Sequence, residues 1–411
     1  MAVDGGMVIV GAGECGARAA FALREAGYGG RVTLIGEERH PPYERPPLSK
    51  DAITGPQAPG AKTIAEPGRY ADAAIALMLS SPVVSIDRAA RRISLADGGT
   101  LPYDRLLLAT GCSPRRLALA REGPRIAYLR TLDDAGRIAE RLGPGKRLAV
   151  IGGGFIGLEL AASARQRRTD VTVVEAQPRI LMRGVPADIA ERIHRLHADN
   201  GVRILCGVGI AAIEDAGDRV AVRLADGRTV EAELLLVGIG AVPNVALAEA
   251  AGLALDNGIA VDATLATSDP FIFAAGDCCS FPLASHDGRR TRLESWRNAQ
   301  EQGALAARNM LGAGEAHAAV PWFWSDQYDH TMQIAGVPDH AATTVRRDLA
   351  DGAFILFQLA EDGRLMAAGG VGPGNVVAKD VRLAEMLIAR GAKPDPASLA
   401  DPGFRLKSLL G

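Results

Sequence analysis

The chain has 411 residues, of which 48% are hydrophobic and 23% are charged, and its formal net charge is −2. This composition is typical of a globular protein with two or three domains and argues against a disordered chain. Because a nearly neutral protein lacks the surplus of basic residues that binds nucleic acid, we expect no nucleic-acid partner.

The N-terminus shows no pattern of a targeting segment. The basic region that opens a signal peptide is missing, and Asp4 leads directly into an expected strand. The longest apolar run, residues 234–248, is interrupted by glycine and proline and is too short to span a membrane. We therefore expect a cytoplasmic protein with no membrane partner.

Residues 7–37 have the pattern of a dinucleotide-binding unit. Its expected elements are a buried parallel strand over residues 7–10, a helix over residues 17–26 and a second strand over residues 31–35. In the turn, Gly11 permits the tight bend, Gly13 lets the backbone approach a pyrophosphate, and Gly16 lets the helix pack on the strand. Glu37 closes the second strand, where a carboxylate can accept hydrogen bonds from both ribose hydroxyls.

Two later segments, Leu106–Gly111 and Phe271–Asp277, predict short apolar strands that each end in a glycine turn. This pattern is expected of a sheet that returns to a bound cofactor. Asp277 is the more informative residue, because a carboxylate that closes a buried strand needs a hydrogen-bonding partner such as ribityl hydroxyls.

Residues 149–175 repeat the dinucleotide pattern with Gly152, Gly154 and Gly157 in the turn and Glu175 at the end of the second strand. A carboxylate at this place binds a free 2′-hydroxyl and repels a 2′-phosphate. Arg179 is the nearby cation that leaves NADPH open. We therefore favour NADH as the nucleotide.

Two dinucleotide sites in one chain indicate two bound dinucleotides that react with each other. The chemistry that joins them is hydride transfer from a nicotinamide to a flavin. The sequence thus predicts an oxidoreductase.

The cysteine and histidine residues do not indicate a metal site. The five cysteines show no CxxC spacing, which fits free thiols in a reducing compartment. For the vicinal pair Cys278 and Cys279 we favour simple packing over redox chemistry. His194 and His197 share one helical face without a third ligand nearby, so we expect a solvated helix face.

Eight motifs together resemble the two-dinucleotide flavoprotein reductases, in particular the NADH-dependent ferredoxin reductases of bacterial oxygenase systems. Putidaredoxin, rubredoxin and biphenyl dioxygenase ferredoxin reductases are examples of this family. The motifs cover nearly the whole chain in the family's order: GAGECG, PYERPPLSK (42–50), LLLATG, YLRTLDDA (128–135), IGGGFIGLELA, VGIGAVPN (237–244), AAGDC (274–278) and PWFWSDQ (321–327).

The resemblance implies an α/β protein of the glutathione-reductase-like type. Two Rossmann-like dinucleotide-binding domains, for FAD and NAD, are followed by a C-terminal α+β domain. The implied boundaries are residues 1–112 and 241–318 for FAD, 113–240 for NAD, and 319–411 for the C-terminal domain. The implied oligomeric state is a monomer or a homodimer.

The resemblance also implies the cofactor-binding residues. FAD would be held by the turn from Gly11 to Gly16 and by Glu37, Arg45, Lys50, Val83 or Val84, Arg130, Asp277 and Trp296. NADH would be held by the turn from Gly152 to Gly157 and by Ile156, Glu159, Glu175 and Gly240. The motifs add Glu14, Cys15, Ala109, Thr110, Gly111, Phe155, Gly276, Glu294, Ser295 and Trp322 to the predicted cofactor-binding residues.

Lys50 and Glu159 are the implied catalytic residues and are expected to meet beside the flavin. Glu159 can accept a hydrogen bond from the nicotinamide amide, and Lys50 can stabilise negative charge that arrives with the hydride. The alternative is a solvated loop lysine and a carboxylate favoured by the helix dipole. Trp322 and Trp324 either line the other face of the flavin or belong to the core.

Glu14 departs from the family pattern, because it places a carboxylate inside the first glycine turn. Beside a pyrophosphate its charge would be repulsive, so we expect the side chain to point to solvent.

Two other functions compete with a ferredoxin reductase. A disulfide or peroxide reductase needs a reactive cysteine near the flavin, and the segment Arg45–Lys50 contains none. A partner-binding flavoprotein similar to apoptosis-inducing factor would carry long insertions and targeting segments, which this sequence lacks. Without a thiol pair we expect electrons to leave singly to an external acceptor, and the resemblance implies that this acceptor is a 2Fe–2S ferredoxin.

An acidic ferredoxin would be attracted by basic residues of the C-terminal part. These are Arg346, Arg347, Lys379, Arg382, Arg390, Lys393, Arg405 and Lys407. The alternative is that they are ordinary solvated side chains interleaved with aspartates.

Overall fold

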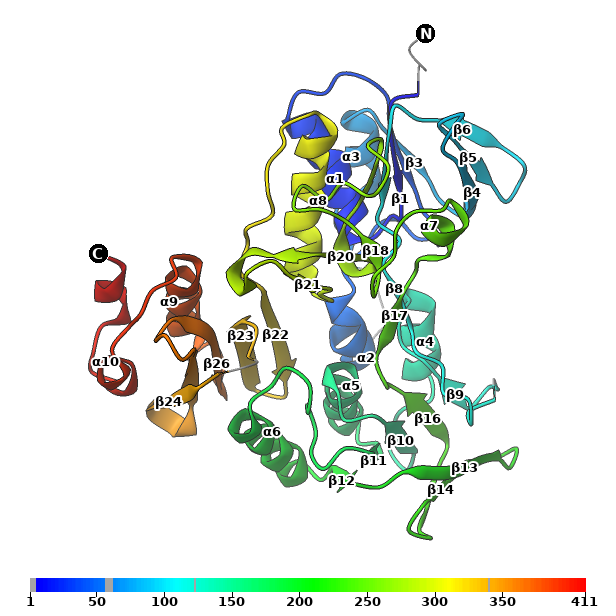
Figure 1. Cartoon of the computed structure of the whole chain (residues 1–411). Helices are drawn as coiled ribbons and strands as arrows, with labels where there is room; N and C mark the ends of the chain where they lie inside the picture. The colour runs from blue at the N-terminus through cyan, green and yellow to red at the C-terminus, as the bar shows by residue number, and fades with distance from the viewer. Residues whose placement is uncertain (1–4, 56–61, 122, 339–340) are drawn as a thin grey trace. The chain divides into compact units, whose positions relative to one another are not determined.

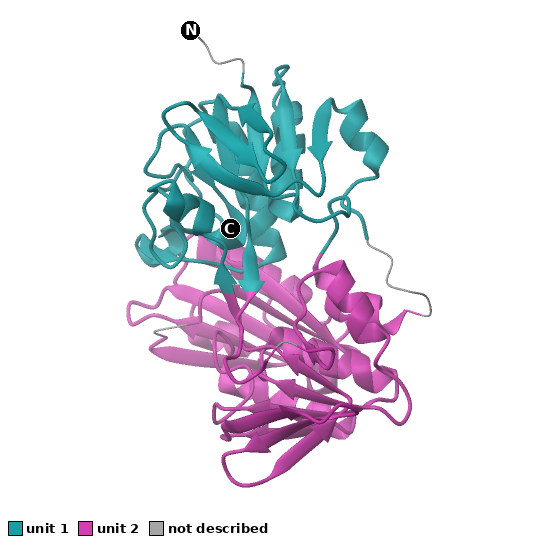
Figure 2. Cartoon of the chain, turned by 90° about the vertical axis from the view of Figure 1, so that its right-hand side faces the viewer, with its two compact units in different colours: residues 1–44, 61–113, 242–319 teal, residues 45–60, 114–241, 320–411 magenta. Residues whose placement is uncertain are grey.

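The computed structural model describes residues 5–55, 62–121, 123–338 and 341–411 (Figure 1). Asp4, on which the expectation about a targeting segment partly rests, lies outside the described residues. The chain forms two compact units, each built from three separate segments (Figure 2). Unit 1 comprises residues 1–44, 61–113 and 242–319, and unit 2 comprises residues 45–60, 114–241 and 320–411.

Unit 1 is organised around a parallel sheet with the strand order β19-β7-β1-β2-β3. Its strands are β1 (Met7–Val10), β2 (Val32–Ile35), β3 (Ile75–Met78), β7 (Arg105–Leu108) and β19 (Ile272–Ala274). Every residue of β1 is buried, as expected for a strand with neighbours on both sides and cover on both faces. The two predicted strands that end in glycine turns are β7 and β19, and they are neighbours in this sheet.

Helix α1 (Glu14–Glu25) follows β1 and packs against α8 (Trp296–Met310), as Figure 1 shows. An added Cβ on Gly303 would lie 2.4 Å from the backbone oxygen of Cys15, so a glycine in α8 permits the close approach of the two helices. Helix α1 begins earlier than the predicted residue 17, because Gly13 in the turn already serves as its N-cap. The other helical elements of unit 1 are α3 (Pro67–Asp72), α7 (Ala246–Ala250), η2 (Gly276–Cys278) and η3 (Ala284–His286).

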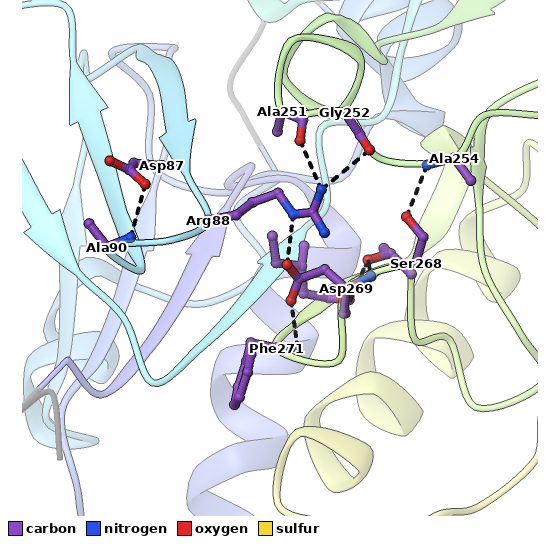
Figure 3. A network of polar contacts seen from close by, with 11 residues as sticks. Asp87, Arg88, Ala90, Ala251, Gly252, Ala254, Ser268, Asp269 and Phe271 are labelled. Carbon is purple, nitrogen blue, oxygen red and sulfur yellow. Dashed lines mark hydrogen bonds and ion pairs between the residues drawn. The ribbon is translucent and has the colours of Figure 1, made fainter. Parts of the chain in front are cut away.

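Two three-stranded sheets complete unit 1. They consist of β4 (Val83–Asp87), β5 (Arg92–Leu95) and β6 (Thr100–Pro102), and of β18 (Ile259–Ala260), β20 (Cys279–Leu283) and β21 (Arg289–Thr291). Arg88, directly after β4, donates from Nε to Asp269 at 2.7 Å and from Nη1 to the carbonyls of Ala251 and Gly252 (Figure 3). This guanidinium ties the β4–β6 sheet to the third segment of unit 1.

Unit 2 contains a second parallel sheet, with the order β12-β11-β10-β16-β9. Its strands are β9 (Ile126–Ala127), β10 (Arg147–Ile151), β11 (Asp170–Glu175), β12 (Arg203–Cys206) and β16 (Leu234–Val237). The antiparallel strands β13 (Ile210–Asp215), β14 (Val220–Leu224) and β15 (Thr229–Ala232) form a small sheet that shares a core with it. The helices are α4 (Leu132–Ala139), α5 (Phe155–Gln166) and α6 (Ala187–Asp199). The short strands β8 (Cys112–Pro114) and β17 (Ala241–Pro243) pair where the chain passes from one unit to the other.

The C-terminal segment of unit 2 forms an antiparallel sheet with the order β22-β23-β26-β25-β24. Its strands are β22 (Trp322–Gln327), β23 (His330–Gly336), β24 (Thr343–Asp348), β25 (Phe354–Leu359) and β26 (Leu365–Pro373). It is accompanied by η4 (Ala350–Gly352), α9 (Ala378–Ala389), α10 (Pro396–Ala400) and η5 (Leu406–Leu410). One apolar cluster joins this sheet to α5 and α6 through residues such as Leu158, Ile193 and Ile334.

The described part of the first segment of unit 2, residues 45–55, packs with the rest of that unit. It contains η1 (Pro46–Ser49) and α2 (Asp51–Thr54), and α2 packs against α4 and α5. The predicted α/β architecture with two parallel sheets and a C-terminal α+β part is confirmed. Among the described residues, no helix combines the length and hydropathy needed to cross a membrane.

Candidate active site

The two glycine turns have the same geometry at their first position. Gly11 has φ +114° and Gly152 has φ +104°, a region that favours glycine. An added Cβ would lie 2.1 Å from the Ala109 oxygen in the first turn and 2.3 Å from the Gly238 oxygen in the second. A side chain at either position would therefore collide with the neighbouring strand's backbone.

The two turns also have the same surroundings at their third glycines, Gly16 and Gly157, and at their second glycines, Gly13 and Gly154. An added Cβ on Gly16 or Gly157 would lie 1.9 or 2.3 Å from the carbonyl oxygen of the first glycine in its own turn. In contrast, a Cβ on Gly13 or Gly154 would meet no atom of the described protein within 4 Å. Each second glycine thus faces open space at a helix N-terminus, which fits the pyrophosphate of a dinucleotide.

Glu14 does not point to solvent, so that expectation is wrong. Its carboxylate accepts hydrogen bonds from Trp296 Nε1 at 3.0 Å and from Gln300 Nε2 at 2.8 Å, both on α8. Burial raises the pKa of the Glu14 carboxyl above its usual value, although these two hydrogen bonds oppose the shift. Glu14 thus links the first glycine turn to α8. One of its two partners, Trp296, is itself a predicted cofactor-binding residue.

The other predicted residues of unit 1 lie in or just after its strands and at the starts of α1 and α8. Glu37, the second residue after β2, is exposed, and Val84 in β4 is 54% exposed. Asp277 accepts a hydrogen bond from Cys112 Sγ at 3.4 Å. The remaining ones are Cys15, Ala109, Thr110, Gly111, Val83, Gly276, Glu294 and Ser295, of which Ser295 caps α8 by accepting from the Asn298 amide.

The vicinal thiols are buried. Cys278 Sγ donates to the carbonyls of Leu108 and Ala275, and Cys279 Sγ donates to Gln302. Burial raises the pKa of both thiols, so neither forms a thiolate readily. These observations favour packing over redox chemistry.

In unit 2, Glu175 braces the second glycine turn. One of its oxygens accepts from the Gly153 amide at 2.7 Å, and the other accepts from the Gln177 amide at 2.7 Å. Arg179 donates instead to the backbone carbonyls of Ile180, Leu181 and Val185. Its guanidinium is therefore engaged in the chain and is a poor candidate for binding a 2′-phosphate.

Lys50 and Glu159 meet within unit 2, as predicted. Lys50 Nζ lies 3.2 Å from Glu159 Oε1 and 5.8 Å from the centre of the Trp324 ring. Glu159 is 5% exposed, so it is a buried carboxylate with a cationic partner, and Lys50 is paired with it instead of being a solvated loop lysine. Trp322 and Trp324 stack on each other at 5.4 Å.

Two serines that sequence analysis did not single out hold the same carboxylate. Ser49 donates to Glu159 Oε2 at 2.5 Å, and Ser325 donates to Glu159 Oε1 at 2.6 Å. Both serines are buried. The signal that could have revealed Ser325 is the alternation in β22, where Ser325 and Gln327 occupy the buried positions.

The remaining predicted residues of unit 2 form two groups. Arg45 donates to the Arg130 carbonyl, which places the segment after residue 44 against the start of α4. Phe155 and Ile156 begin α5, with Ile156 46% exposed, and Gly240 has φ +101° with open space at its Cβ position.

The structure removes one residue from the proposed basic docking surface. Arg347 is 3% exposed and donates to the carbonyls of Asp401 and Phe404, so it holds the C-terminal segment in place. Lys379 and Arg382 on α9 are exposed.

His197, expected on a solvated helix face, is completely buried, so that expectation is wrong as well.

Comparisons with known proteins agree with this geometry. Residues 6–303 match the family described as pyridine nucleotide-disulphide oxidoreductase, and residues 322–410 match the family described as reductase C-terminal. The chain is 44% identical over 407 residues to the ferredoxin–NAD(+) reductase component of the anthranilate 1,2-dioxygenase system of Burkholderia cepacia, covering 98% of both chains. It is 36% identical to putidaredoxin reductase of Pseudomonas putida, covering 100% of this chain and 98% of that protein.

Solved structures show the same likeness. The ferredoxin reductase for the CYP199A2 system from Rhodopseudomonas palustris has a TM-score of 0.94 and 38% identity, covering 99% of this chain and 100% of that one. The reductase in the covalent putidaredoxin reductase–putidaredoxin complex has a TM-score of 0.94 and 35% identity, covering 100% of this chain and 99% of that one.

Proposed function

Since the chain belongs to the pyridine nucleotide-disulphide oxidoreductase family and also carries a reductase C-terminal domain, we propose that it is an FAD-containing, NADH-dependent ferredoxin reductase. Its partner is a 2Fe–2S ferredoxin that supplies electrons to an oxygenase. The observation that carries this proposal is the pair of glycine turns with one geometry, because a hydride donor and a hydride acceptor each need such a site.

We assign FAD binding to residues 1–112 and 241–318, NADH binding to residues 113–240, and the C-terminal domain to residues 319–411. The first turn, with Gly13 at its open position, and Glu37 would bind the pyrophosphate and ribose of FAD. Gly154 and Glu175 would bind the same groups of NADH. We place the enzyme in the cytoplasm, as a monomer or a homodimer.

FAD, when bound, supplies the chemistry of accepting a hydride from NADH and releasing electrons one at a time. Glu159 would accept a hydrogen bond from the nicotinamide carboxamide and thereby orient the ring. Lys50, which is paired with Glu159, would supply fixed positive charge for the negative charge that arrives with the hydride.

The alternative of a disulfide reductase is disfavoured by the buried cysteines with raised pKa. We expect NADH to reduce the anaerobic, FAD-loaded protein without changing its number of titratable thiols. Steady-state NADH oxidation should be rapid with a 2Fe–2S ferredoxin. New thiols on reduction would support the disulfide reductase, and negligible turnover with ferredoxin and with cytochrome c would support a partner-binding protein.

Glu175 is expected to set the preference for NADH, because its carboxylate repels a 2′-phosphate and Arg179 is held by backbone carbonyls. Glu175→Ala should reduce the preference for NADH over NADPH, measured as the ratio of the two kcat/KM values, by a factor that corresponds to on the order of 1 to 3 kcal/mol. Arg179→Ala should not lower kcat/KM for NADPH, because Arg179 is not expected to bind the 2′-phosphate. Equal kcat/KM with both nucleotides in the unmodified enzyme would show that Glu175 does not discriminate.

A further inference from the structure

A chain of buried polar side chains leads from α6 to Glu159. His197 Nε2 lies 2.6 Å from Gln327 Oε1, and Gln327 Nε2 donates to Ser325 Oγ at 3.1 Å. Ser325 then donates to Glu159 Oε1 at 2.6 Å. None of these four residues is more than 5% exposed, so every hydrogen bond lies within the protein interior.

The chemistry of the groups fixes the direction of these hydrogen bonds. An amide oxygen can only accept, so His197 must carry a proton on Nε2 and donate it to Gln327. Burial lowers the pKa of His197 to about 4, so the ring is neutral near pH 7. Its single N–H proton is therefore the one on Nε2. Because the Gln327 amide nitrogen can only donate, Ser325 accepts from it and turns its own proton to Glu159.

The acceptor positions of the Glu159 carboxylate are therefore nearly filled. Ser325 and Lys50 lie at Oε1, and Ser49 donates to Oε2. Ser49 is itself fixed, since its carbonyl accepts from Ser163 Oγ at 2.7 Å. A carboxylate has about four lone-pair positions, so among the described residues one position on Oε2 has no donor.

We propose that Ser325, oriented by Gln327 and His197, is a positioning residue that holds Glu159 with one acceptor position directed to the nicotinamide carboxamide. This inference rests on the proposed function, because it assigns Glu159 to NADH. It also gives the C-terminal domain a part in hydride transfer, since Ser325 and Gln327 belong to β22 while Glu159 belongs to α5.

The test compares two ligands that differ in the nicotinamide. Binding of NAD⁺ and of ADP-ribose to the FAD-loaded protein is measured by calorimetry, and FAD reduction at saturating NADH by stopped flow. Ser325→Ala should weaken NAD⁺ binding about tenfold, as expected for a disturbed hydrogen bond to a charged group, and leave ADP-ribose binding unchanged. The reduction rate at saturation should also fall.

Thr331→Val is the matched control. Thr331 is a buried residue of the adjacent strand β23, and its hydroxyl donates to the Asp326 carboxylate at 2.8 Å instead of to Glu159. This variant should bind both ligands normally. Ser325→Thr should restore NAD⁺ binding, because it keeps the hydroxyl group. Ser325→Cys, with a weak donor of similar size, tests the same point if Ser325→Ala does not fold.

An equal loss of NAD⁺ and ADP-ribose affinity, or no loss of either, would overturn the assignment of Ser325. If the unmodified protein fails to reduce its FAD with NADH, the proposed function itself is wrong. The two failures are therefore distinguishable in one set of measurements.

Discussion

Replacing Lys50 by methionine should slow the reduction of bound FAD by NADH about a hundredfold, the scale on which loss of one electrostatic stabiliser acts in an active site. Methionine keeps most of the side-chain length but removes the charge 3.2 Å from Glu159. A buried carboxylate without its cation is costly, so the environment of Glu159 is disturbed as well. Anaerobic stopped-flow absorbance of the flavin measures this rate directly.

Lys379→Met is the control for this experiment, because Lys379 is exposed on α9. It should leave the reduction rate by NADH unchanged. If Lys50→Met reduces its flavin as fast as the unmodified enzyme, Lys50 is a structural partner of Glu159 and takes no part in hydride transfer.

The second glycine of each turn should separate cofactor binding from folding. Gly13→Ala should lower FAD affinity about a hundredfold, toward the upper end expected when an extra methyl group is forced into a packed contact. The Tm of the apoprotein should fall only slightly, because no described protein atom lies within 4 Å of the added Cβ and Gly13 has φ −89°, so the remaining cost is that alanine is a poorer N-cap than glycine. Fluorescence titration with FAD and thermal unfolding of the apoprotein measure the two effects.

Gly154→Ala provides the reciprocal comparison in unit 2. It should stay yellow and lose NADH affinity, because its Cβ position is equally open. Gly16→Ala, in contrast, should fail to fold normally, since its Cβ would lie 1.9 Å from a backbone oxygen. Unchanged FAD affinity in Gly13→Ala would mean that the pyrophosphate does not lie at this turn.

The glycine turns could be predicted from the sequence because their determinants are local. Gly11, Gly13 and Gly16 lie within one strand, one turn and one helix, and each has a separate steric reason. The meeting of Lys50 and Glu159 is not local, and it followed from the family resemblance instead.

The errors concern residues whose partners are distant in the sequence. Glu14 was expected to face solvent, but its partners Trp296 and Gln300 follow more than two hundred residues later. The position of His197 depends on Gln327 in a separate sheet. Serine is common in every structural class, so Ser49 and Ser325 became recognisable only when their hydrogen bonds to Glu159 were known.

The three-segment construction of unit 1 has a consequence for synthesis on the ribosome. Strand β7 is complete after residue 108, but its neighbour β19 begins only at Ile272. Until then one backbone edge of the leucine-rich strand β7 has no partner strand, and such an apolar edge is a template for aggregation. We therefore expect nascent chains stalled before β19 to need a chaperone, although a complete parallel sheet can already form from residues 126–237 of unit 2.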